Sequence, residues 1–117
     1  MARTAITSEV VPTNTPMALE DLTFTAADTS NGNAFPYTGR DVLIVYNSHA
    51  STTYTFTPTS VAINGRHDPK NGVAQNLTAG QFMLVNYRGE GWKQSDGNVY
   101  IDANNAAIKF CPIVLPA

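Results

Sequence analysis

Two histidines, nine carboxylates and one cysteine are the side chains of this sequence that could do acid–base, metal or nucleophilic chemistry. His49 and His67 lie in separate turn-forming regions, and neither has a second His, Cys or carboxylate at a ligand spacing such as H-x-x-x-H. Asp68 follows His67 directly, but neighbouring side chains in an extended loop diverge. We therefore expect solvated loop histidines, no metal site and no bound cofactor.

The carboxylates also lack the neighbouring groups that a catalytic site needs. Most of them lie where Asp bends or caps the backbone, as at Asp28, Asp68 and Asp96. An acid–base pair of Asp96 with Asp102 would need carboxyl groups about 5 to 10 Å apart, and nothing beyond their even spacing supports it. The chain has no G-x-S-x-G elbow, no P-loop, no G-x-G-x-x-G before a helix and no zinc signature. We predict that the protein is not an enzyme.

Two further side chains have properties that need an explanation. Cys111 has no second cysteine to pair with and lies in an apolar run, which favours a small buried hydrophobe over a reactive thiolate. Trp92 follows Gly91 and precedes a polar run. It could be a lid over one end of a core, an anchor for a partner protein or a stacking platform for a sugar ring. The residues alone leave these three roles open.

Composition narrows the class of protein. A chain of 117 residues makes one domain, which buries enough surface to fold without disulfides. Charged residues make up 14% of it, the net charge is −2, and the seven cations are scattered, whereas nucleic-acid binders gather theirs into a stripe. No apolar stretch reaches the roughly 18 residues of a membrane span, and no signal peptide is visible. We expect no nucleic-acid partner, no membrane partner and synthesis in a cytoplasm-like compartment.

The elements that position these residues are predicted to be strands. Apolar and polar residues alternate with a period of two, and clusters of turn formers interrupt them every 8 to 12 residues. The predicted strands are 22–25, 42–46, 53–57, 61–63, 73–77, 81–87, 98–102 and 106–115. We expect an all-β fold, an antiparallel β-sandwich of jelly-roll-like form. Residues 42–46 form a continuous apolar run, which predicts a central strand covered on both faces.

The beginning of the chain differs from the rest. Residues 1–17 carry two prolines and only three apolar β-branched side chains, and they predict an extended N-terminal arm before a single sandwich domain at 18–117. Burial of so few side chains does not offset the entropy of ordering the arm, so pairing with a sheet, its own or a neighbour's, would have to supply the difference. A partly disordered terminus is the alternative. Residues 16–21 have room for one helical turn.

Several segments together carry a family resemblance. They are FPYTGRDVLIVYN at 35–47, a threonine-rich strand, GEGWKQSDGNVYIDA at 89–103 and IKFCPIVLP at 108–116. Their order resembles the capsid decoration, or cement, proteins of tailed bacteriophages. The likeness covers nearly the whole chain from about Thr4. Its most specific parts are F-P-x-x-G-R and W-x-Q-S-D-G-x-V-Y-x-D.

The resemblance implies a non-enzymatic virion structural protein, made in the host cytoplasm and located on the capsid exterior. Such a protein would bind the lattice of the major capsid protein as a homotrimer and stabilise it. On this hypothesis we expect the arm and an apolar end surface to contact the capsid or a neighbouring subunit. The residues concerned are Arg3, Ile6 and Val10 of the arm and Phe35, Tyr37, Arg40 and Trp92 of the loops.

Two other functions remain open at this stage. A carbohydrate-binding sandwich on the virion surface would use Trp92 and Tyr100 as platforms, with Asp96 and Asn98 as polar neighbours. A head–tail connector or tail component would also be structural but would form a ring.

Overall fold

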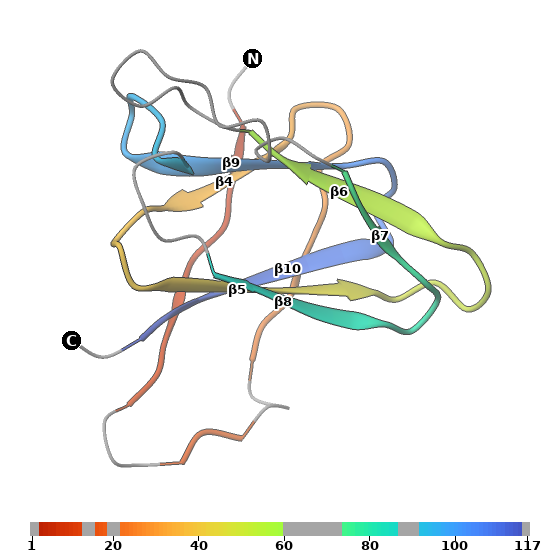
Figure 1. Cartoon of the computed structure of the whole chain (residues 1–117), viewed down its shortest axis with the longest axis horizontal. Coiled ribbons are helices and arrows are strands. Elements are labelled where there is room, and N and C mark those ends of the chain that lie inside the picture. Colours follow the sequence, from red (N-terminus) through yellow and green to blue (C-terminus); the bar gives the residue numbers. More distant parts are fainter. Residues whose placement is uncertain (1–2, 13–15, 19–21, 60–73, 87–91, 116–117) are drawn as a thin grey trace.

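The computed structural model describes residues 3–12, 16–18, 22–59, 74–86 and 92–115. Within these residues there are strands and no helix, and the strands form two sheets packed face to face (Figure 1). The all-β prediction is therefore confirmed. The strands are β1 (Thr4–Ala5), β2 (Glu9–Val10), β3 (Thr25–Ala26), β4 (Asn33–Pro36), β5 (Asp41–Asn47), β6 (Tyr54–Pro58), β7 (Gln75–Leu77), β8 (Phe82–Asn86), β9 (Asn98–Ala103) and β10 (Ile108–Val114).

The chain passes back and forth between the two sheets. Sheet A has the strand order β1-β4-β9-β6-β7, and sheet B has the order β2-β10-β5-β8, with β3 also pairing with β10. Most neighbours are antiparallel, as predicted, but β1 runs parallel to β4 and β2 runs parallel to β10. Both sheets are thus mixed, which corrects the expectation of purely antiparallel pairing. Both parallel pairs join the N-terminal segment to strands far from it in sequence.

The core lies between the sheets and is built by the alternation of each strand. In β5 the side chains of Leu43 and Val45 are fully buried, while those of Val42, Ile44 and Tyr46 point the other way and are half-buried. Phe56 of sheet A and Phe110 of sheet B meet edge to face, with ring centroids 6.4 Å apart. The other fully buried side chains of the apolar core are Phe35, Leu77, Val99, Ile101 and Ile108.

The strand β5 is central, between β10 and β8, as the sequence predicts. Its inward side chains are fully buried, whereas its outward side chains are half-buried, so the expected cover of both faces is only partly met. On the outer face, cover is more complete over β10, where Cys111 and Ile113, the partners of Ile44 and Val42, are buried. This face is important for the site described below.

The described part of the N-terminal segment pairs with the chain's own sheets. β1 joins the edge of sheet A and β2 joins sheet B, so the segment passes from one layer to the other (Figure 1). Between them, the amide of Ile6 donates to the carbonyl of Ala34 over 2.8 Å, and the Ile6 side chain is 2% exposed. Of the two open alternatives for arm pairing, the chain therefore uses its own sheets.

Other predictions vary in outcome. The strands expected at 42–46, 53–57, 73–77, 81–87, 98–102 and 106–115 are confirmed with small shifts of their ends, whereas that at 22–25 is reduced to β3. Residues 16–18 are not helical, and the rest of the proposed helical turn lies outside the described residues, as do the strand at 61–63 and the loop after it. Among the described residues, no helix is long and apolar enough to cross a membrane.

Candidate functional site

The outer face of sheet B carries a group of neighbouring apolar side chains that point away from the core. Strand pairing places them in rows, because directly opposite residues of a sheet point to the same face. One row runs from Lys109 through Tyr46 to Phe82, and the next runs through Ile44 to Leu84. We call Phe24, Tyr46, Ile44, Phe82 and Leu84 the outer apolar face.

Three aromatic rings form one end of the outer apolar face. Tyr46 and Phe82 are direct cross-strand partners, and their rings stack with centroids 4.1 Å apart and planes at 11°. Phe24 comes just before β3 and meets both rings edge to face at 6.2 Å. Edge-to-face and offset-stacked pairs are the arrangements that the ring quadrupole favours, so this cluster is a fixed and not a loose surface feature.

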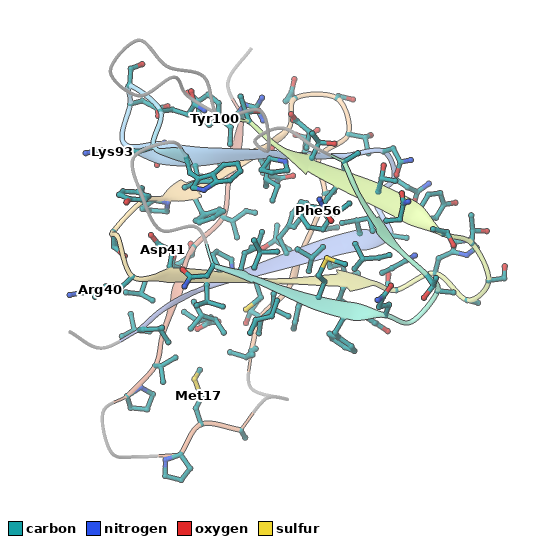
Figure 2. The ribbon with its side chains drawn as sticks, in the orientation of Figure 1. Met17, Arg40, Asp41, Phe56, Lys93 and Tyr100 are labelled. Atoms are coloured by element: carbon teal, nitrogen blue, oxygen red, sulfur yellow. The ribbon has the colours of Figure 1, made fainter. Side chains whose placement is uncertain are left out.

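The outer apolar face is open to solvent along β8, whereas Phe24, Ile44 and Tyr46 are half-buried. The side chain of Phe82 is 59% exposed and that of Leu84 is 68% exposed. Figure 2 shows Met17, in the segment beyond this sheet, directing its side chain toward the same layer. Val10 is also 68% exposed but lies on β2, at the opposite edge of sheet B. Adjacent apolar groups that remain in water are typical of surfaces that bind a partner.

A charged cluster lies on the outer side of sheet A. Arg3 Nη1 is 2.7 Å from Asp102 Oδ1, and the guanidinium lies 4.4 Å from the centroid of the Tyr100 ring. The Tyr100 hydroxyl donates to Asp96 Oδ2 over 2.6 Å. This bond is the main reason that the pKa of Asp96 is lowered and that of Tyr100 is raised. The cluster satisfies its own charges and fastens β1 to β9.

Gly32 lies directly under this cluster. Its φ is +78°, in the left-handed region that favours glycine. A Cβ built there would collide with Asp102 Oδ1 and Arg3 Nη1. The ion pair therefore occupies the space that any other residue at position 32 would need.

Two other carboxylates hold turns. Asp28 accepts bonds from the Thr4 hydroxyl and from the amides of Ser30 and Asn31. These bonds, with that from Thr4 the strongest, lower the pKa of Asp28. Asp41 is fully buried and accepts from the Thr38 amide over 2.7 Å and its hydroxyl over 2.9 Å. Both carboxylates shape backbone, as the sequence predicts for Asp28.

The histidines and the cysteine show no site chemistry in the described residues. His49 Nδ1 accepts hydrogen bonds from the amides of Ser51 and Thr52, while His67 lies outside the described residues. Cys111 is buried, and burial, with the charge of Glu9, raises the pKa of its thiol to about 11. No group of three or more His, Cys, Asp or Glu side chains in this part of the chain could hold a metal ion.

The residues predicted from sequence to form the interface do not come together on one surface. Phe35 lies in β4 and is fully buried, and Ile6 is 2% exposed, so both belong to the core instead of a contact surface. Tyr37 and Trp92 are half-buried and pack against the core. For Trp92 this is the arrangement expected of a core lid. The predicted end surface is thus corrected for Phe35.

The other three predicted residues are spread over the molecule. Arg3 is paired within the chain to Asp102, and Val10 is exposed on β2. Arg40 is half-buried in the turn before β5, and Figure 2 shows its side chain directed away from the sandwich. Of the seven predicted residues, Val10 alone is exposed, whereas Arg40 is half-buried.

The side chains named for sugar binding are also engaged. Arg3 lies over the Tyr100 ring, and the Tyr100 hydroxyl is bonded to Asp96. The Asp96 carboxylate also accepts from the amide of Asn98 over 3.1 Å. A sugar ring stacked on Tyr100 from that side would have to displace Arg3.

Sequence reasoning missed the outer apolar face, although a signal was present. The stretch FMLV at 82–85 places apolar side chains on both faces of one strand, and no charged residue occurs between Lys70 and Arg88. In a two-layer sandwich each strand faces the core on one side only. One of the two apolar faces of β8 must therefore remain outside.

Comparison of the chain with protein-family models, with curated proteins and with solved structures found no match.

Proposed function

We propose that this protein is a non-enzymatic structural protein of a tailed-bacteriophage virion. In this role it decorates the capsid exterior as a jelly-roll-like homotrimer and stabilises the shell by binding the lattice of the major capsid protein. The proposal begins with the sequence resemblance. Its segment 35–47 contains the end of β4 and all of β5, and the described part of its segment 89–103 contains β9.

The observation that carries the proposal is the outer apolar face. Phe82 and Leu84 keep more than half of their side-chain surface in water, next to the Tyr46–Phe82 stack. Aromatic and aliphatic side chains at the centre of a patch supply most of the binding energy of protein interfaces. A sheet face of this kind suits a flat, repeating protein surface better than it suits a small molecule.

The use of the carboxylates supports a structural role. Those of Asp28, Asp41, Asp96 and Asp102 each accept bonds that hold a turn or join two strands. A catalytic carboxylate must instead point at a substrate with a proton to give or accept. Binding to the assembled shell alone would stabilise the shell by mass action, by RT ln(1 + [L]/Kd) at each site.

The test compares two exposed side chains on opposite edges of sheet B. Purified Phe82→Ser and Val10→Ser proteins are mixed with capsids that lack the protein, and bound protein is measured after sedimentation. We expect Phe82→Ser to weaken capsid binding by about tenfold or more, and Val10→Ser to change it by less than about threefold. Loss with Val10→Ser alone would move the contact to the arm.

Absence of the protein from purified virions would end the proposal. The same follows if neither substitution changes binding.

A further inference from the structure

The strand β8 combines the features of an edge that is built to be paired. It forms one border of sheet B, and no described strand pairs with it on the side away from β5. Its outward side chains Phe82 and Leu84 are exposed, and its inward side chains Met83 and Val85 are only half-buried. A strand with apolar residues on both faces is usually central, whereas β8 has a neighbour on one side only among the described strands.

The backbone of β8 presents hydrogen-bonding groups on the side away from β5. The Asn47 amide donates to the Gln81 carbonyl, which sets the alternation between β5 and β8. In an antiparallel pair bonded residues alternate, so Met83 and Val85 bond to β5, whereas the N–H and C=O groups of Phe82, Leu84 and Asn86 point away from it. Three successive positions of this kind are a template for a further strand.

The β8 edge also lacks the residue types that prevent an edge strand from pairing with another chain. Residues 74–86, which hold β7 and β8, contain no charged residue and no proline. Charged side chains, especially lysine, and proline are what natural edge strands use to prevent pairing. The absence of charge also favours a contact between two identical copies. A twofold axis places each residue near its own counterpart, so a charged residue there would meet a like charge and repel it.

We propose that β8 is a self-association edge, at which two copies of the chain pair antiparallel about a twofold axis centred on Leu84. Leu84 of one copy then lies opposite Leu84 of the second copy, and Phe82 lies opposite Asn86 of the second copy. The outward-pointing backbone groups of both copies form about six hydrogen bonds. Sheet B becomes one continuous sheet across the two molecules, and Met83 and Val85 gain cover from the second copy.

Pairing would also enlarge the outer apolar face. An aromatic side chain has about 200 Å² of surface, so the exposed parts of Phe82 and Leu84 amount to roughly 250 Å² in one copy. Two adjacent copies present roughly 500 Å² on one continuous face, closer to the ~800 Å² per partner of a standard interface. The pairing itself involves this chain alone and does not depend on the proposed capsid partner.

The first test is the mass of the purified full chain by sedimentation velocity at about 10 to 100 μM. A twofold contact predicts an even number of 12.6 kDa chains: a dimer, or a hexamer if trimers also form. Leu84→Lys puts two ammonium groups opposite each other and should weaken the even-numbered species at least tenfold. The matched control is Val10→Lys, because Val10 has the same exposed fraction of 68% at the other edge of sheet B.

The second test needs no substitution. Amide hydrogen exchange is measured by NMR at low and high protein concentration. The Leu84 amide should be protected only at high concentration, whereas the Met83 amide, bonded to β5, should be protected at both.

A monomer or a trimer as the sole species would overturn the proposal. So would equal masses for Leu84→Lys and wild type, or rapid exchange of Leu84 at every concentration. None of these outcomes bears on whether the protein binds capsids, which the sedimentation assay with Phe82→Ser decides separately.

Discussion

Replacement of Gly32 by alanine tests the charged cluster most directly, because a Cβ at this position would collide with both partners of the Arg3–Asp102 ion pair. Two costs add. An alanine held at φ +78° loses about 1–2 kcal/mol relative to glycine. Displacement of a solvent-exposed ion pair costs about 0.2–1 kcal/mol, and loss of the Arg3–Tyr100 contact costs about 0.5–1 kcal/mol. We expect Gly32→Ala to reduce the free energy of unfolding by about 2–4 kcal/mol.

Gly80→Ala is the matched control, since Gly80 has φ +76° and no atom lies within 4 Å of a Cβ built there. It should lose only the backbone cost of about 1–2 kcal/mol. Urea unfolding followed by tryptophan fluorescence gives both values, provided that the dependence on urea has the same slope in each variant. The Arg3→Ala variant completes a cycle: with Arg3 already removed, Gly32→Ala should cost about 1 kcal/mol less than it does in the wild type.

Equal losses for the two glycine variants would refute this reasoning. Strict additivity of Gly32→Ala and Arg3→Ala would do the same, because it would mean that the guanidinium does not lie over Gly32.

Three further predictions concern single side chains. The folded-state pKa of Asp28 is lowered from 3.8, so its stabilising effect is complete above pH 3.8 and is lost as pH falls through the lower folded value; Asp28→Asn should flatten the acid side of a pH–stability curve, and an unchanged slope would contradict this. With a pKa of about 11, the Cys111 thiol should react with a thiol reagent at neutral pH only as fast as the protein unfolds, and immediate labelling of the native protein would be contrary. Trp92→Ala should lower the unfolding free energy by about 2–4 kcal/mol if Trp92 is a core lid, whereas an anchor would leave the urea midpoint unchanged and reduce binding.

The sequence was sufficient to predict the strands with strong alternation. Tyr54 and Phe56 alternate with threonines, and residues 108–114 form a long apolar run, so β6 and β10 were found close to their observed ends. Period-two alternation is a local property, and it needs no knowledge of the partner strand. The capping and turn roles of Asp28 and Asp96 were also evident, because they depend on residues only two or three positions away.

What the sequence did not determine was how distant segments meet. The parallel pairing of Thr4 with Asn33, and of Val10 with Val114, has no local signature. The sequence predicts Phe35 as a loop residue of an apolar end surface, but the pairing of β4 with β9 places it in a strand, where it is fully buried. The outer apolar face is missed for a related reason. The sequence shows that a strand is apolar, but it does not show which face of the strand is left uncovered in the fold.

Sheet B has a further consequence for how the chain is made. β2, β3 and β5 all bond to β10, so only the contact between β5 and β8 can form in this sheet before residues 108–114 have been synthesised. Until then β2 and β3 have no partner strand in this sheet, and β5 lacks one of its two neighbours. We therefore expect maturation to be largely post-translational and slow, since segments joined late are separated by most of the chain.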